Sequence, residues 1–321
     1  MWRAVLAASG AALLGALTIG AGAAGGAGAA VTTLAGAPAC YGAAARDPER
    51  PCRNPDLRLA VTPAPADPVS APRQPCETTW EVCAVGPLDG TASAQVALIG
   101  DSHAAMIRPA FRIIGEQRGI QVSNIWRPGC PFSTLPPDLG RRRSQDCVTW
   151  SRRIVDWLKG RPKISTVVLA AHQLARVAPQ PGLSPFDAKV SGYEAAIRSL
   201  PASVKRVIVV RDPPNNPREI SSCVRREYER GQSAATRCRS RRADVLQPDA
   251  QVEAARRVRS RAVDVIDLTP FMCGPAQCVP VVGGVLVHKD GDHLTAEFAT
   301  TLAPYLDRAI RRMRPAVPGF R

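Results

Sequence analysis

Two short segments near opposite ends of the chain carry side chains that could act together as nucleophile, base and acid. Ser102 follows an apolar run in Leu-Ile-Gly-Asp-Ser-His, and His293 lies three residues after Asp290 in Asp-Gly-Asp-His-Leu. A serine hydroxyl becomes a good nucleophile when an imidazole takes its proton, and a carboxylate can orient that imidazole. The spacing therefore predicts acyl transfer through an ester of Ser102, with Asp292 as a second possible acid, if folding brings the segments together.

Each of these residues also has an ordinary interpretation. Ser102 could cap the helix that begins there, because serine is a favoured N-cap residue. His288, Asp290, Asp292 and His293 could instead hold a metal ion, but no ligand pattern elsewhere in the sequence supports a metal site. We therefore expect neither a metal nor another cofactor.

The elements that must position these residues alternate between strands and helices. Five short apolar segments, rich in β-branched residues, have the pattern of strands buried on both faces. This alternation predicts an α/β fold with a doubly wound parallel sheet and right-handed crossovers. Sites in such sheets form at the carboxyl ends of strands, where Ser102 would lie. The predicted strands cover residues 96–99, 121–125, 166–170, 206–210 and 262–266.

Helices are predicted to fill the gaps between these strands. One helix is expected to begin at Asp249, and Thr295 is expected to cap the last one, which carries an apolar stripe to residue 310. Residues 211–247 are too long for an ordinary connection and are predicted to form a lid or a substrate-facing insertion. Residues 270–288 are predicted to form a small hairpin that leads to the histidine segment.

The composition indicates an exported protein with a basic surface. The 321 residues have a formal net charge of +15, which favours an anionic neighbour such as phospholipid, an acidic envelope polymer or nucleic acid. Nucleic acid is not expected, because no zinc-finger spacing or RNA-binding aromatic motif accompanies the arginines. Residues 1–35 are predicted to be a signal peptide or a retained membrane anchor, residues 36–95 a Pro- and Ala-rich leader, and residues 96–313 the catalytic domain.

The ten cysteines occur as near neighbours, and an even number in an exported chain predicts disulfides. The sequence does not fix the connectivity, and nearest-neighbour pairing is the simplest choice. No two cysteines have the C-x-x-C spacing of a structural zinc site. The expected pairs are Cys40–Cys52, Cys76–Cys83, Cys130–Cys147, Cys223–Cys238 and Cys273–Cys278.

The two chemical segments together resemble those of the SGNH hydrolase superfamily. Gly100-Asp101-Ser102-His103 lies near the start of the core and Asp290-x-x-His293 near its end. Within that superfamily, the chain resembles the extracytoplasmic SGNH domain fused to bacterial membrane acyltransferases that O-acylate envelope glycans. The cysteine-bearing leader, the Gly129-Cys130-Pro131 turn and the apolar strand at residues 167–171 also fit this likeness, which covers about residues 40–313.

The resemblance implies a three-layer α/β/α sandwich with a flavodoxin-like parallel sheet. It also implies that Ser102 is the nucleophile, His293 the base and Asp290 the orienting acid. The backbone N–H groups of Ser102 and Gly129 would bind the oxyanion.

The resemblance leaves two candidates for a third oxyanion donor. The superfamily usually supplies an asparagine after the third strand, but this place reads Ala171-His172-Gln173 here. His172 or Gln173 is therefore the candidate donor by resemblance.

The predicted function is that of an exported, serine-dependent O-acyltransferase acting on an envelope polysaccharide or glycolipid. The alternatives are a secreted carbohydrate esterase and a non-catalytic, glycan-binding accessory domain, the latter suggested by the missing asparagine. The sequence contains one long hydrophobic segment, so a separate membrane acyltransferase is an expected partner. We expect the protein outside the cytoplasm, in the bacterial cell envelope, either secreted or held at the membrane by its N-terminal segment.

Overall fold

The structure is a computed structural model, and it describes residues 36–68, 82–259 and 262–320. The segment predicted to be a signal peptide or anchor, residues 1–35, lies outside the described residues. Within the described ranges, no helix combines the length and apolar composition that a membrane crossing needs.

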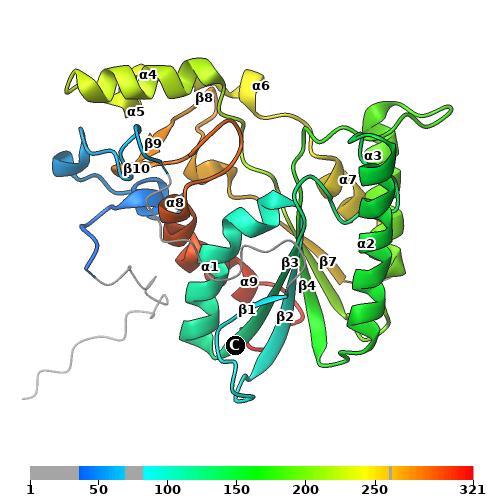
Figure 1. Cartoon of the computed structure of the whole chain (residues 1–321). Coiled ribbons are helices and arrows are strands. Elements are labelled where there is room, and N and C mark those ends of the chain that lie inside the picture. The colour runs from blue at the N-terminus through cyan, green and yellow to red at the C-terminus, as the bar shows by residue number, and fades with distance from the viewer. Residues whose placement is uncertain (1–35, 69–81, 260–261, 321) are drawn as a thin grey trace, which may run out of the picture. The chain divides into compact units, whose positions relative to one another are not determined.

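A six-stranded sheet forms the centre of the fold (Figure 1). The strand order is β1-β3-β2-β4-β5-β7, and every neighbouring pair is parallel except the pair made by the edge strand β1. The five parallel strands thus follow the flavodoxin-like order, which confirms the predicted fold. The strands are β1 (Cys83–Val85), β2 (Ala94–Gly100), β3 (Ile120–Trp126), β4 (Ile164–Ala170), β5 (Arg206–Val210) and β7 (Ala262–Ile266).

All five predicted strands are present, and β5 and β7 have the predicted bounds. The sequence did not predict β1, which lies in the proline-rich leader and has only three residues. It pairs antiparallel with β3, where Cys83 faces Asn124. Part of the leader is therefore built into the sheet.

Helices cover both faces of the sheet (Figure 1). Thr295 caps α8, as predicted, and the helix expected to begin at Asp249 is α7, which has Asp249 as its cap. The single helix expected at the C-terminus is divided at Leu302, because Pro304 lies in the first turn of a new helix. One face carries α1 (Ser102–Arg118), α8 (Ala296–Thr301) and α9 (Ala303–Arg311), and the other α2 (Arg141–Lys159), α3 (Pro185–Ser199) and α7 (Ala250–Arg257).

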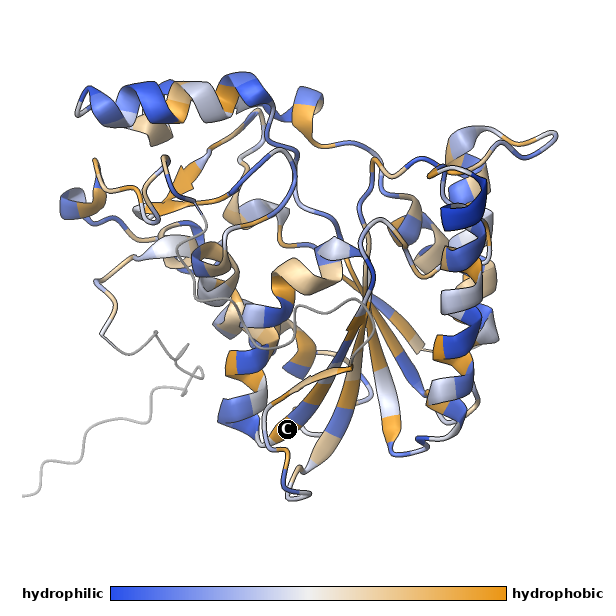
Figure 2. Cartoon of the chain, in the orientation of Figure 1, coloured by the Kyte–Doolittle hydropathy of each residue, from blue (hydrophilic) through white to orange (hydrophobic). Residues whose placement is uncertain are grey.

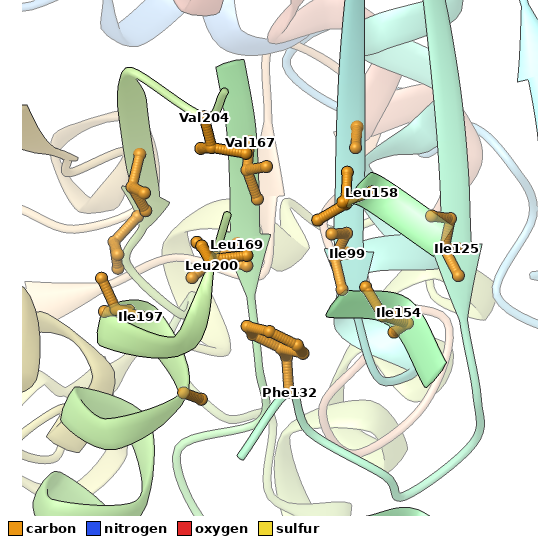
Figure 3. Close-up of a cluster of buried hydrophobic side chains, with 14 of the residues drawn as sticks. Ile99, Ile125, Phe132, Ile154, Leu158, Val167, Leu169, Ile197, Leu200 and Val204 are labelled. Carbon is orange, nitrogen blue, oxygen red and sulfur yellow. The ribbon is translucent and has the colours of Figure 1, made fainter. Parts of the chain in front are cut away.

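The core on the α2–α3 face is made by apolar side chains that recur at helical spacing. Figure 3 shows Ile154 and Leu158 of α2 against Ile99 of β2, and Ile197 of α3 close to Leu169 of β4. The central strands are largely apolar along their length, whereas the helices alternate apolar and polar surfaces (Figure 2). Burial of these strands on both faces explains why they show no polar alternation.

The connection after β5 is not a bare loop, because it forms short elements of its own. They pack on the predicted hairpin, where Val224 and Cys238 contact the cluster that contains Val281 and Leu286. The hairpin prediction is confirmed. The elements of the connection are α4 (Arg218–Glu229), α5 (Ala234–Arg237), β6 (Ser240–Arg241) and α6 (Arg242–Val245), and those beyond β7 are β8 (Gln277–Cys278), β9 (Val281–Val282) and β10 (Val285–Leu286).

Three single 3-10 turns complete the described elements: η1 (Gly42–Arg46), η2 (Pro55–Leu57) and η3 (Thr269–Phe271). The first of them packs on α8, where Ala43 N–H donates to Thr301 Oγ1 at 3.0 Å. This contact joins the leader to the C-terminal part of the core.

Four of the five predicted disulfides are confirmed. They are Cys40–Cys52, Cys130–Cys147, Cys223–Cys238 and Cys273–Cys278. The fifth expected pair contains Cys76, which lies outside the described residues. Each confirmed bridge closes a short loop and so reduces the conformational entropy of the unfolded chain.

Trp150 is 1% exposed and belongs to the cluster of buried side chains on the α2–α3 face. Its truncation is therefore predicted to reduce stability strongly. Trp150→Ala should lower the free energy of unfolding by about 3–5 kcal/mol, because it creates a cavity. Urea unfolding of the oxidised protein measures this. Leu88→Ala, at a side chain that is 63% exposed, is the control and should change stability by less than about 0.5 kcal/mol. A loss below about 1 kcal/mol at Trp150 would contradict the described packing.

Candidate active site

Ser102 is the first residue of α1, directly after β2. The cap of this helix is Asp101, whose carboxylate accepts a hydrogen bond from the His103 N–H at 2.9 Å. The Ser102 hydroxyl is therefore not used as a cap, which removes the ordinary interpretation of this serine. A Cβ on Gly100 would lie 1.8 Å from the carbonyl oxygen of Ala170, so the glycine allows the ends of β2 and β4 to approach closely.

The structure brings His293 to Ser102. The Nε2 atom of His293 lies 2.8 Å from Ser102 Oγ, although 191 positions separate them in the sequence. The other ring nitrogen, Nδ1, lies 3.0 Å from Asp290 Oδ2. The three side chains thus form the chain of contacts that a nucleophile, a base and an orienting acid require.

Two carboxylates share the Nδ1 atom of His293. Asp290 meets the geometry of a hydrogen bond to it, and Asp292 Oδ1 forms a close ion pair with it at 2.8 Å. Asp290 is the more firmly held, because its Oδ1 also accepts the backbone N–H groups of His293 at 2.8 Å and Asp292 at 3.1 Å. Asp290 is therefore better placed to fix the orientation of the ring.

These carboxylates set the charge of His293. Its hydrogen bonds to Asp290 and Asp292 raise its pKa from the ordinary 6.5 to about 9. Burial alone would raise the pKa of Asp290, but the hydrogen bonds from His293 outweigh burial and lower it. The hydrogen bond from His293 likewise lowers the pKa of Asp292. At neutral pH the resting site therefore contains an imidazolium whose Nδ1 atom faces two carboxylates.

The segment after β5 holds the loop that carries Asp290 and His293. Asn216 is 6% exposed. Its N–H donates to Gly291 O at 2.8 Å and its Nδ2 to Asp290 O at 3.0 Å. Sequence reasoning missed Asn216, although Asp-Pro-Pro-Asn-Asn begins two residues after the end of a predicted strand and thus lies at the edge of the sheet where sites form.

A second, buried histidine–aspartate pair lies beside the first. His103 Nδ1 contacts Asp212 Oδ1 at 2.5 Å, and the two side chains are 2% and 1% exposed. Burial alone would lower the pKa of His103, but the charge and hydrogen bond of Asp212 and the charge of Asp101 together outweigh burial and raise it. The His103 ring stacks on His172 at 4.5 Å and lies 5.0 Å from the His293 ring. The sequence analysis did not foresee this pair.

The predicted oxyanion donors differ in how they are placed. Among the described residues, the backbone N–H groups of Ser102 and Gly129 have no acceptor. Gly129 has a φ of 67°, and the turn that contains it begins with a hydrogen bond from Arg127 N–H to Gly100 O at 3.2 Å. Both N–H groups are thus free, at the ends of adjacent strands, to bind a ligand.

The two candidates for the third donor are not equivalent. Gln173 is 4% exposed and donates its Nε2 to Pro213 O at 3.1 Å. His172 is only partly buried, and its Nε2 lies 3.4 Å from Asp292 Oδ2. Burial and the neighbouring His103 lower the pKa of His172, which favours a neutral ring. The geometry therefore favours His172 over Gln173.

Metal ligation fits these side chains less well than proton transfer. Ligand atoms in two sets, His103–Asp292–His293 and His103–His172–Asp212, lie within 4.8 Å of one another. Both ring nitrogens of His293 already have partners, however, and the His103 and His172 rings are inclined by only 12°. Lone pairs in the planes of two stacked rings do not converge on one point. His288, from the set considered in the sequence, is buried, and burial lowers its pKa to about 4.

Comparison with known proteins identifies the family and supports the fold. The family profile of the SGNH domain (fused to AT3 domains) matches residues 66–308. The chain belongs to this family. Among solved structures, this SGNH domain is similar to the periplasmic domain of a lipopolysaccharide acetyltransferase of Salmonella ser. Paratyphi A, with a TM-score of 0.53 and 15% identity, over 69% of this chain and 85% of that one. At this identity the likeness shows the fold alone. The comparison with curated proteins found no match.

The contacts of His293 predict an unusually basic imidazole. Histidine ring signals followed by NMR between pH 5 and 11 should show one ring that titrates near 9, which His293→Gln would assign by its disappearance. Asp292→Asn should lower this pKa, because it removes one of the two carboxylates, whereas Asp187→Asn at the start of α3 should leave it unchanged. A midpoint near 6.5 in the wild type would contradict the ion pairs.

The raised pKa of His293 also predicts how the stability of the protein depends on pH. Because the folded state raises the pKa of His293, its contribution to stability is complete below pH 6.5 and is lost as the pH rises through about 9. Thermal unfolding at pH 7 and pH 10 should therefore show a smaller decrease in Tm for His293→Gln than for the wild type.

Proposed function

We propose that this SGNH domain is a serine-dependent acyl-transfer enzyme that acts on a cell-envelope glycan. The observation that carries the proposal is the contact of 2.8 Å between Ser102 Oγ and His293 Nε2, with Asp290 on the far side of the ring. Membership of the SGNH family supports acyl-ester chemistry. The four disulfides support a location outside the cytoplasm.

The first half of the reaction forms an acyl-serine. Neutral His293 takes the proton of the Ser102 hydroxyl as Oγ attacks the carbonyl carbon of the acyl donor. The N–H groups of Ser102 and Gly129 stabilise the resulting oxyanion, and His172 is the third donor. The His293 imidazolium then gives its proton to the leaving group as the bond from the acyl carbon to that group breaks.

The second half returns the enzyme to its starting state. A sugar hydroxyl of the acceptor attacks the carbonyl carbon of the acyl-serine, and His293 takes the hydroxyl proton. The Ser102 ester bond breaks, and the same proton passes to Oγ. The acceptor leaves with a new O-acyl ester, so the transfer needs no oxidant and no cofactor.

The acyl group would come from a membrane acyltransferase. Domains of this family are fused to AT3 domains, which supports a membrane acyltransferase as donor or partner. The N-terminal hydrophobic segment would keep this domain close to the membrane, where such a donor would deliver the acyl group.

Hydrolysis is the second candidate reaction. The side chains of His293 and Asp290 are 24% and 47% exposed, so water can reach the base. Water would then replace the sugar hydroxyl, and the protein would be a carbohydrate esterase. Glycan binding alone would not require the aligned contacts of Ser102, His293 and Asp290.

A fluorophosphonate probe tests the proposed nucleophile. The oxidised wild type should be labelled, and Ser102→Ala should not, because only an activated serine attacks this phosphorus. Ser93→Ala, at a surface serine, is the control. Turnover of a chromogenic acetyl ester should fall by roughly a millionfold in Ser102→Ala or His293→Gln. Folded wild-type protein that resists the probe would overturn the catalytic proposal in favour of a glycan-binding role.

The same ester separates transfer from hydrolysis. With an envelope glycan as acceptor, a transferase should form the O-acetyl glycan faster than free acetate, as measured by mass spectrometry and acetate release. Release of acetate alone would favour the esterase.

A further inference from the structure

Three arginines that have no ion-pair partner among the described residues lie around the small loop at residues 273–278. Arg242 Nη1 donates to the carbonyl oxygen of Gly274 at 3.3 Å, and Arg239 Nη1 donates to Gln277 Oε1 at 3.4 Å. Arg46 Nη2 lies 3.6 Å from the position that a Cβ on Gly274 would take. The leader and the insertion thus bring guanidinium groups to one loop, which the Cys273–Cys278 disulfide closes.

Two arginines close in sequence to Arg239 and Arg242 are paired with carboxylates. Arg237 contacts Glu227 at 2.8 Å and Arg241 contacts Asp244 at 2.8 Å. In the part of the chain that the structure describes, Arg46, Arg239 and Arg242 form no ion pair with any carboxylate. The cluster is therefore a local excess of positive charge on a chain whose formal net charge is +15.

Without a bound anion, the cluster of Arg46, Arg239 and Arg242 lowers the stability of the folded protein. Like charges held close together repel one another and oppose folding. Arg46 Nε is buried with no hydrogen-bond partner among the described residues, and burial followed by the charge of Arg239 lowers the pKa of Arg46. An anion between the guanidinium groups would supply both the missing charge and the missing acceptor.

The fold holds this cluster on the side of the candidate active site. The strand β6 pairs with β8, which fixes the positions of Arg239 and Arg242 relative to the loop. Figure 1 shows β8 and α6 beyond the end of the sheet from which α1, and hence Ser102, begins. The chain continues from β8 through the β9–β10 hairpin to the loop that carries Asp290 and His293.

We propose that Arg46, Arg239 and Arg242 bind an oxyanion group, a carboxylate or a phosphate, of the glycan that accepts the acyl group. Guanidinium groups suit this ligand, because their paired N–H groups match two oxygens of a carboxylate or phosphate. The identity of the glycan as acceptor rests on the proposed function, whereas the binding of its anionic group does not. The site selects acidic glycans over neutral ones of the same length.

Binding of defined oligosaccharides to the oxidised full chain tests the site. The probes are an oligogalacturonate, an oligo(glycerol phosphate) and a neutral malto-oligosaccharide, each titrated calorimetrically at two salt concentrations. The wild type should bind at least one anionic probe and not the neutral one, and the stronger anionic probe distinguishes carboxylate from phosphate. Failure of both anionic probes to bind would overturn the site.

Matched variants distinguish this site from general attraction by a basic surface. Arg239→Ala should weaken binding of the anionic probe at least tenfold. Arg241→Ala removes the same charge from an arginine that Asp244 already pairs, so it should have little effect. An equal loss in both variants would mean non-specific attraction and would contradict the proposal.

Thermal unfolding gives an independent readout that does not depend on catalysis. Without ligand, Arg239→Ala should have a Tm equal to or above that of the wild type, because repulsion is relieved. The anionic probe should raise the Tm of the wild type but not that of Arg239→Ala. Fluorophosphonate labelling of Ser102 should be unchanged in this variant. If labelling failed while the anion still raised the Tm, the catalytic proposal would fall and this site would stand.

Discussion

The contact between Ser102 Oγ and His293 Nε2 is the constraint on which the rest of the site depends. Its two partners lie at opposite ends of the core sequence, and a distance of 2.8 Å leaves little tolerance for movement. The parallel sheet meets this requirement by placing β2 at its centre, so that the start of α1 lies at the carboxyl edge. Gly100 then allows β4 to approach, and Asn216 fixes the loop that returns His293 to the same edge.

Buried charge at this edge opposes folding and has to be compensated locally. Asp101 is 1% exposed, and burial raises its pKa, yet its carboxylate accepts backbone N–H groups from both His103 and His172. The bond from His172 joins the end of β2 to the end of β4, and the bond from His103 caps α1. The His103–Asp212 pair extends the connection to β5. A buried pair of this kind adds little net stability, so its consequence is a fixed arrangement of strand ends around Ser102.

The sequence contained the information for the strands and for the contact of Ser102 with His293 and Asp290, but not for this polar network. Apolar, β-branched runs report burial directly, and for this reason all five parallel strands were predicted. The Ser102 and His293 segments were recognised as motifs. His103, Asp212 and Asn216 were missed, because partners on different strand ends show no periodicity and no fixed spacing. The choice between His172 and Gln173 as the third oxyanion donor also required the structure. Only the structure shows that the Gln173 side-chain amide already donates to Pro213 O.

Two carboxylates on one imidazole have opposing consequences for the chemistry. In the proposed reaction they stabilise the imidazolium that would form when Ser102 loses its proton, but a pKa of about 9 leaves only about one per cent of His293 neutral at pH 7. The two carboxylates differ in how firmly the structure holds them. Asp290 is fixed by two backbone N–H groups, whereas the side chain of Asp292 also faces His172. Asp290 therefore provides the orientation of the base, and Asp292 mainly adds to its basicity.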